Sequence, residues 1–499
     1  MTTQPLLLAI DQGTSATKAV LVDGCGNLVR SASAPLSTAH PRPGWVEQSA
    51  EEIRQSVATA VQACLAEHDP ARVAGVGLST QRESCLLWER ATGRPLGPVL
   101  GWQDRRTADA CAKLLADGLG KDVRATSGLP LDPMFSALKA QWLLDAHDPD
   151  RSRARRGELC LGTVDSWLLW RMTGGAEHVI EVGNAARTQL LDVRTRSWDE
   201  RLLDLFDIPR AALPRIASSV GPFSPVRGLS PLVDGTPVAA VLGDSHAALF
   251  GHGVFVPGSV KATYGTGSSV MGLIAGPAQA ERSPLCLTIA WDDGTPAYAL
   301  EGNIRSSGST LSWLASLFGM SAGELAARAA DDSGGVHLVP AFGGLAAPWW
   351  DNEATGLISG LTFGSSLPQL ARAALESVAL QVEDVVAGLD SAAGRVSTVL
   401  ADGGPTDNAA LMQLQADTSG RAVRRPRARD LSALGAAHLA GCALGMFGKD
   451  QLTRLDRAED VYHPQLPREE RTRRRQAWHD AVTRACRPGP PNAGSGRSS

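Results

Sequence analysis

The sequence lacks several features that would assign a protein to a class at once. It contains no run of about 18 apolar residues, so we expect no membrane-spanning segment and no membrane insertion. Its N-terminus has no basic region, and Asp11 interrupts the first apolar segment, so we expect no signal peptide. The formal net charge of only -4 gives no reason to expect a nucleic-acid partner.

The eight cysteines form no CxxC pair and show no matched spacing. Neither a zinc site nor a disulfide framework is therefore indicated. Reduced thiols are typical of the cytoplasm, which is the localisation we expect.

The organisation of the chain indicates two α/β domains. A chain of 499 residues exceeds the size at which a single core usually keeps growing. Apolar runs at 6–10, at 19–22 and before Arg82 predict buried strands, and the apolar spacing over 49–68 predicts a helix. In such alternating folds, sites gather at the carboxyl ends of strands.

Two stretches resemble one another in pattern. "IDQGTSATKAVLVD" (10–23) and "SVKATYGTGSSVMGLIAG" (259–276) both suggest a strand, a small polar turn and a second strand. The first stretch has neither the GxxxxGK[ST] nor the GxGxxG spacing, so taken alone it favours a simple hairpin turn. Two such turns facing one another could instead hold a polyphosphate, and a third turn, "DGGPTDN" (402–408), could admit a flat base. Both interpretations stay open on the residues alone.

An ordered series of motifs resembles the FGGY family of carbohydrate kinases, and within it most resembles glycerol kinases. The series runs from residue 6 to residue 445 and includes "IDQGTSATKAV", "STQRES", "GWQDRR", "GDSHAALFGHG", "TYGTGS", "LEGNI", "ADGGPTDN" and "ALGAAHLAG". The resemblance implies two actin-like domains of ribonuclease-H topology with ATP and substrate in the cleft between them. We place these domains at 1–243 and 244–486, followed by a low-complexity tail at 487–499.

The resemblance implies that Asp244 is the general base, because transfer of a phosphoryl group to an alcohol needs an acceptor for the hydroxyl proton. The simpler alternative is that Asp244 caps the N-terminus of a helix. The resemblance also assigns Arg82 and Glu83 to substrate hydroxyls, against the alternative of a solvated ion pair, and Trp102 to the carbon skeleton of the substrate, against core packing.

The resemblance implies ATP and Mg²⁺ as cofactors. Asp11 and Asp244 are the predicted carboxylates near the metal, largely through water. The predicted ATP-binding residues are Gly13, Thr14, Ser15, Lys18, Thr266, Gly267, Gly308, Ser312, Gly404 and Asn408. At Ser312, glycerol kinases usually present a glutamine instead.

The sequence departs from glycerol kinases in the predicted substrate pocket. Met134 stands where they usually carry tyrosine, Ser245 where they carry glutamine, and Ser269 where they carry a large aromatic residue. We therefore expect a wider, more polar pocket suited to a tetritol, a pentitol or a ketopentose. His246 could bond a substrate hydroxyl or pack, which we favour over a role as a second acid or base.

The predicted function is an ATP-dependent kinase for a terminal hydroxyl of a small polyol or sugar of about three to five carbons. Glycerol kinase proper and a ketopentose (xylulose-type) kinase are alternatives. A non-enzymatic actin-like ATP switch and a catalytically silent sugar sensor are alternatives of another class. A homodimer is left open.

Overall fold

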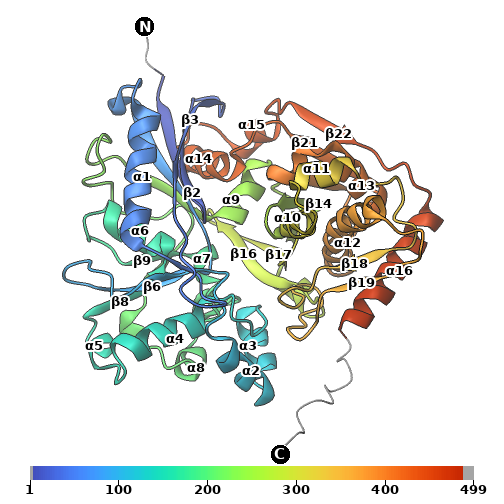
Figure 1. Ribbon diagram of the computed structural model, residues 1–499. Coiled ribbons are helices and arrows are strands. Elements are labelled where there is room, and N and C mark those ends of the chain that lie inside the picture. Colours follow the sequence, from blue (N-terminus) through green and yellow to red (C-terminus); the bar gives the residue numbers. More distant parts are fainter. Residues whose placement is uncertain (1–3, 487–499) are drawn as a thin grey trace, which may run out of the picture.

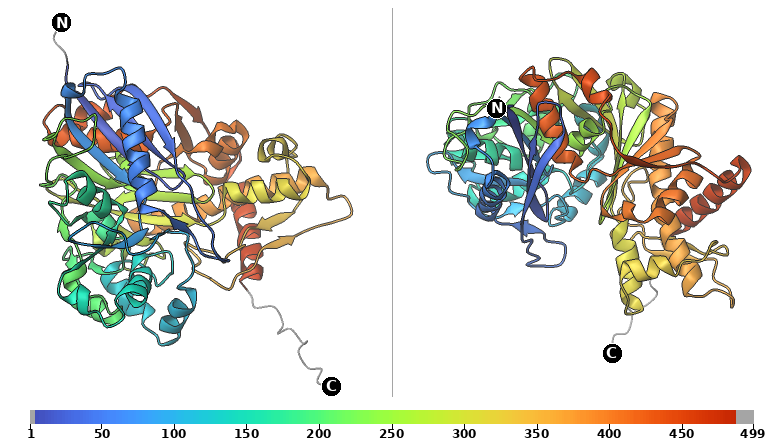
Figure 2. Two further views of the ribbon diagram at one scale, coloured as in Figure 1. Left: turned by 60° about the vertical axis from the view of Figure 1, so that its left-hand side comes forward. Right: turned by 90° about the horizontal axis from the view of Figure 1, so that it is seen from above.

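The computed structural model describes residues 4–486, so the predicted tail at 487–499 lies outside the described residues. The chain forms two α/β lobes, each built around its own sheet (Figure 1, Figure 2). In Figure 1 the first half of the chain, blue to green, lies on the left and most of the second half, yellow to red, lies on the right.

The first sheet has the strand order β13-β5-β1-β2-β3. Strand β2 runs antiparallel to both of its neighbours, β1 and β3, whereas β5 and β13 run parallel to β1. The bounds are β1 (Leu6–Gln12), β2 (Ala16–Val22), β3 (Leu28–Pro35), β5 (Val73–Thr80) and β13 (Val238–Gly243).

The second sheet has the order β16-β17-β15-β14-β20-β21-β22. Its inner strands repeat the first sheet, because β14, β15 and β17 are antiparallel neighbours and β20 and β21 run parallel to β14. The two similar stretches of sequence are thus the corresponding hairpins of a topological repeat. The bounds are β14 (Ser259–Tyr264), β15 (Ser268–Ile274), β16 (Cys286–Asp292), β17 (Pro296–Ile304), β20 (Thr398–Asp402), β21 (Ala422–Pro426) and β22 (Glu459–Tyr462).

Smaller sheets extend both lobes. A four-stranded sheet comprises β4 (Glu47–Gln48), β7 (Val99–Leu100), β6 (Cys85–Glu89) and β8 (Leu159–Thr163). Three two-stranded sheets pair β9 (Val179–Glu181) with β12 (Arg215–Ala217), β10 (Leu191–Asp192) with β11 (Ser197–Trp198), and β18 (His337–Val339) with β19 (Leu357–Ser359).

The helices cover the sheets. Helix α1 forms where the apolar spacing predicts it: Ser49 caps its first turn, and Ile53, Val57, Val61 and Cys64 are buried. The helices are α1 (Ala50–Leu65), α2 (Ala108–Ala116), α3 (Gly120–Ser127), α4 (Ser136–His147), α5 (Ser152–Arg155), α6 (Val164–Met172), α7 (Val182–Ala185), α8 (Glu200–Leu205), α9 (Asp244–Gly251), α10 (Gly308–Leu317), α11 (Ala322–Ala327), α12 (Leu367–Ala393), α13 (Ala409–Ser419), α14 (Leu431–Ala443), α15 (Lys449–Thr453) and α16 (Arg468–Ala485).

One helix of the second half returns to the first sheet. Helix α14 packs on β1, β5 and β13 and lies against α9, as Figure 1 shows. The contact is close because small residues line it: a Cβ added at Gly435 would come within 1.8 Å of the Ala247 carbonyl oxygen. Helix α14 therefore joins the two halves of the chain beside Asp244.

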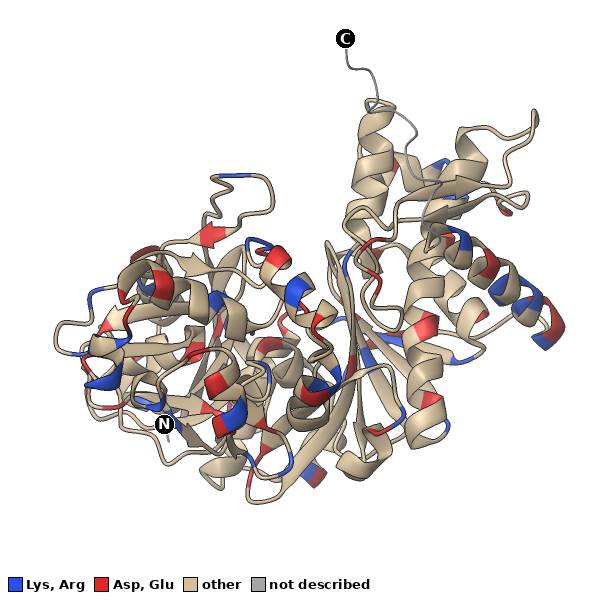
Figure 3. Ribbon diagram, turned by 90° about the horizontal axis from the view of Figure 1, so that it is seen from below, with Lys and Arg blue, Asp and Glu red and all other residues tan. Residues whose placement is uncertain are grey.

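Charges of both signs are interspersed over both lobes and along α16 (Figure 3). No helix within residues 4–486 combines the length and the apolar character needed to cross a bilayer. All eight cysteines are free thiols.

Candidate functional site

The first predicted phosphate turn is the hairpin between β1 and β2. Gly13 donates its backbone N–H to the Ala16 carbonyl at 3.0 Å, which closes the turn. The Gln48 side chain donates to the Thr14 carbonyl at 2.7 Å, and the Ser15 carbonyl accepts from Leu36 at 2.9 Å. These bonds immobilise the turn while the Ser15 side chain stays exposed, so a hairpin turn and a phosphate-binding turn are compatible.

Lys18 lies on β2, directly opposite Asp11 in the β1–β2 ladder. Its ammonium group forms an ion pair with Asp430 at 2.9 Å, and Asp430 also accepts from the Ser31 hydroxyl. The partner of the Lys18 amine is thus Asp430, just before α14, and its predicted contact with the phosphates stays a prediction. This pair joins the phosphate hairpin to the second half of the chain.

Asp11 and Asp244 are close enough to influence each other. The Ser79 hydroxyl donates to Asp11 at 2.7 Å. Burial, together with the negative charge of Asp244, raises the pKa of Asp11 to about 7, although the hydrogen bond from Ser79 opposes the shift. Mg²⁺ prefers oxygen ligands, so the carboxylates of Asp11 and Asp244 are chemically suited to hold it. Within residues 4–486, no group of three or more His, Cys, Asp or Glu side chains forms a metal cluster.

Asp244 is the first residue of α9, directly after β13. Gly243 occupies the N-cap position, so the alternative that Asp244 is itself the cap is wrong. Its carboxylate accepts from the Ser245 backbone at 2.6 Å and lies 3.2 Å from Nε of Arg82. Burial raises the pKa of Asp244, although the charge of Arg82 opposes the shift. The partly exposed carboxylate is a suitable proton acceptor.

Arg82 and Glu83 are buried, with relative exposures of 4% and 5%, so the alternative of a solvated ion pair is wrong. They also do not pair with each other. Arg82 donates two hydrogen bonds to Glu301, at 2.7 and 2.6 Å, whereas Glu83 accepts from Nε of Arg187 at 2.5 Å. Glu83 has a φ of 61°, a strained value for a side-chain-bearing residue that such partners must maintain.

Glu301 and Arg187 escaped the sequence-based prediction. Burial alone would raise the pKa of Glu301, but the charges of Arg187 and Arg82 hold it well below its usual range. The signal was a carboxylate inside the apolar strand "YALEGNI", since a buried charge requires partners. The sequence could not name those partners because Glu301 lies 219 positions from Arg82.

Two of the departures from glycerol kinases, Ser245 and Ser269, lie beside Asp244. The Ser245 hydroxyl donates to the Ser269 hydroxyl at 3.2 Å, and Ser269 donates to Glu301 at 2.8 Å. Buried Lys261 donates to Ser269 at 3.3 Å. A chain of small polar groups therefore begins next to the predicted base.

Three neighbouring side chains complete this region. Met134 is half-buried and packs near Phe135 and Cys286. Trp102 is half-buried, and its backbone N–H donates to Ser84 at 3.0 Å. His246 is fully buried and lies 3.3 Å from Arg82, and its pKa is well below the usual range because burial disfavours its charged form. The structure therefore favours packing over acid–base chemistry for His246.

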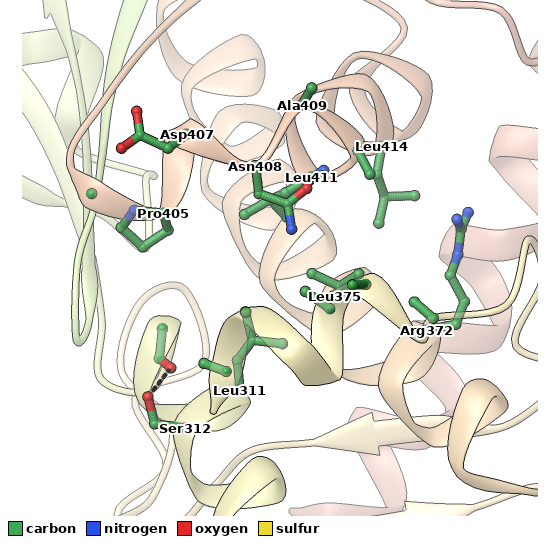
Figure 4. A pocket seen from close by; sticks show the side chains of 18 of the residues that line it. Leu311, Ser312, Arg372, Leu375, Pro405, Asp407, Asn408, Ala409, Leu411 and Leu414 are labelled. Atoms are coloured by element: carbon green, nitrogen blue, oxygen red, sulfur yellow. Dashed lines mark hydrogen bonds between the residues drawn. The ribbon is translucent and has the colours of Figure 1, made fainter. Parts of the chain in front are cut away.

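A cavity of about 1250 Å³ opens in the second lobe (Figure 4). Five predicted ATP-binding residues line it: Thr266, Gly308, Ser312, Gly404 and Asn408. Gly267 lies in the same β14–β15 turn but outside the lining. The walls of the cavity include Leu311, Leu375, Leu411 and Leu414, and these apolar side chains suit a flat apolar base.

Two residues that line the cavity form hydrogen bonds within their own helices. Asn408 caps α13 by accepting from the Leu411 backbone at 3.1 Å. The Ser312 hydroxyl donates to the Gly308 carbonyl at 3.2 Å, the dashed line in Figure 4. Ser312 therefore contributes a short side chain at the cavity wall.

Comparison with known proteins agrees with this geometry. The N-terminal domain model of the FGGY family of carbohydrate kinases matches residues 6–251, and the C-terminal domain model matches residues 260–444. Glycerol kinase of Geobacter sp. (strain M21) is 42% identical over 95% of this chain and 98% of its own length. Apulose kinase of Pectobacterium atrosepticum is 41% identical over 96% and 98%. The crystal structure of Plasmodium falciparum glycerol kinase with ADP superimposes with a TM-score of 0.88 at 29% identity, covering 97% of this chain and 98% of that one.

Proposed function

The chain belongs to the FGGY family of carbohydrate kinases, and we propose that its acceptor is a polyol or sugar of four or five carbons, phosphorylated on a terminal hydroxyl. As a member of this family it is an ATP-dependent alcohol phosphotransferase, so the non-enzymatic alternatives fall away. The acceptor proposal is carried by one observation: short hydroxyl side chains, Ser245 and Ser269, meet at 3.2 Å beside Asp244.

In the proposed reaction, Asp244 accepts the proton of the acceptor hydroxyl. The hydroxyl oxygen forms a bond to the γ-phosphorus of ATP, and the bond from that phosphorus to the β–γ bridging oxygen breaks, which releases ADP. The raised pKa of Asp244 suits a base that must take up a proton while Arg82 lies 3.2 Å away. Arg82 and Glu83 orient the acceptor, and Trp102 and Met134 contact its carbon chain.

The proposed ATP site combines both lobes. Gly13, Thr14 and Ser15 bind phosphates from the first lobe, Thr266 and Gly267 bind them from the second, and the 1250 Å³ cavity holds the nucleoside. Mg²⁺, when bound, would neutralise phosphate charge, and Asp11 and Asp244 are the residues that would hold it.

Overall sequence identity does not indicate which acceptor this chain uses, because the glycerol kinase and the apulose kinase are almost equally identical to it, at 42% and 41%. The test is ADP production with a panel of three- to seven-carbon polyols and sugars. We expect the highest kcat/KM with a four- or five-carbon acceptor. A much higher kcat/KM for glycerol would contradict the acceptor proposal, and turnover with no member of the panel would contradict the proposed function.

We also propose that the enzyme acts in the cytoplasm, which its eight free thiols support. A homodimer stays a prediction, which light scattering of the purified protein checks.

A further inference from the structure

Glu301 occupies a central place between the two halves of the chain. It lies on β17 of the second sheet, is fully buried, and pairs in the strand ladder with Met271 and Cys286. Its neighbouring charges come from the first half: Arg82 follows β5, and Arg187 follows α7. One carboxylate therefore receives two guanidinium groups across the junction of the lobes.

The geometry fixes which edge of Arg82 faces the reaction. Its two terminal nitrogens donate to the two Glu301 oxygens at 2.7 and 2.6 Å. This bidentate fork leaves the Nε edge facing Asp244 at 3.2 Å. Without Glu301, Asp244 would be the remaining ion-pair partner of Arg82, so the guanidinium could rotate toward Asp244.

Arg187 connects Glu301 to Glu83. Its Nη1 lies 3.0 Å from Glu301, and its Nε donates to Glu83 at 2.5 Å. Glu83 holds a left-handed backbone conformation, which needs a fixed partner to persist. Arg82 and Glu83 are therefore held by the same carboxylate, that of Glu301. Arg82 binds it directly, and Glu83 is connected to it through Arg187.

We propose that Glu301 is a positioning residue for the acceptor site, holding Arg82 directly and Glu83 through Arg187. This inference rests on the proposed function only where it concerns the acceptor. Glu301 also accepts from Ser269, so the same carboxylate orients the short hydroxyl that widens the pocket. The role of Glu301 is to align the acceptor. Glu301 does not line the nucleotide cavity in the second lobe, so we expect ATP binding not to depend on it.

The test compares Glu301→Gln with Glu383→Gln in the full-length protein. Glu383 is a matched control because it is also buried and receives two arginines, Arg421 and Arg475, yet it contacts none of the proposed site residues. For Glu301→Gln we expect the acceptor KM to rise about tenfold or more and the ATP KM to stay within about twofold. For Glu383→Gln we expect neither KM to change, even if its melting temperature falls.

A second readout does not require turnover. Hydrogen exchange of the backbone amides of Arg82, Glu83 and Ser84 should accelerate about tenfold or more in Glu301→Gln but not in Glu383→Gln. An inactive wild-type enzyme would contradict the proposed function, whereas this exchange difference would still support the positioning by Glu301.

Two results would overturn the inference. One is an unchanged acceptor KM with unchanged exchange in Glu301→Gln, and the other is equal changes in both variants. If Glu301→Gln does not fold, Arg187→Gln takes its place, with the same expected rise in acceptor KM and the same control.

Discussion

The indole Nε1 of Trp102 donates a hydrogen bond to the Thr14 hydroxyl at 3.0 Å. Trp102 is a predicted acceptor contact, and Thr14 belongs to the predicted phosphate turn. The bond places the two halves of the proposed reaction next to each other, and both side chains are only half-buried.

Trp102→Phe should therefore impair both substrates. Phenylalanine keeps an aromatic ring but cannot donate, so we expect the acceptor KM and the ATP KM each to rise about two- to tenfold. Trp88→Phe is the control, because the Trp88 indole nitrogen has no hydrogen-bond partner within residues 4–486. Unchanged kinetics for Trp102→Phe would show that the bond has no part in the site.

Asp244→Asn should remove turnover while leaving acceptor and ATP binding largely intact. An amide cannot take the hydroxyl proton, so we expect kcat to fall about 10²- to 10⁴-fold. Steady-state kinetics and calorimetric titration of the acceptor measure the two effects separately. A near-normal kcat would refute the assignment of the base.

Ser269→Phe should shift the acceptor preference toward glycerol. The aromatic ring would fill the space beside Ser245 and break the bond to Glu301. We expect the ratio of kcat/KM for glycerol to that for five-carbon polyols to rise about fivefold or more. Ser268→Ala is the control, since Ser268 instead bonds buried Ser307 at 2.7 Å. An unchanged ratio would place the acceptor elsewhere.

Adjacent glycines in the third turn should respond differently to alanine. A Cβ at Gly403 would come within 1.9 Å of the Tyr264 carbonyl oxygen, and φ there is 97°, so Gly403→Ala should be strongly destabilised. Apart from its two chain neighbours, a Cβ at Gly404 meets no atom of residues 4–486 within 4 Å. Gly404→Ala should thus keep its melting temperature while the ATP KM rises, because the methyl group would enter the nucleoside cavity. Normal ATP kinetics for this variant would remove Gly404 from the site.

Glu181 should make stability depend on pH. Burial raises its pKa to about 8 from 4.5, although Ser219 and Asn184 donate to it. The folded protein therefore keeps a proton that the unfolded chain releases, so the stability that Glu181 contributes falls as pH rises from about 5 to about 8. Glu181→Gln lacks this dependence. Its melting temperature relative to wild type should increase by about 2 °C or more between pH 5.5 and pH 8.5, and a constant difference would contradict the assignment.

The sequence determined the elements whose signals are local. The apolar spacing predicted α1, and the small polar turns predicted the β1–β2 and β14–β15 hairpins. The order of motifs along the chain identified the family, and with it the predicted base and nucleotide residues, five of which line one cavity. These inferences need only periodicity, turn chemistry and motif order.

Only the tertiary structure decided which charges meet. Arg82 and Glu83 are neighbours in sequence, yet each binds a different partner, and Lys18 pairs with Asp430 at a separation of 412 positions. Charge pairing depends on distance in space and on burial, which makes an unpaired charge costly, and neither quantity is written in the local sequence. The sequence therefore determined the family, whereas the folded chain determined that Glu301 binds both Arg82 and Arg187 beside the proposed acceptor site.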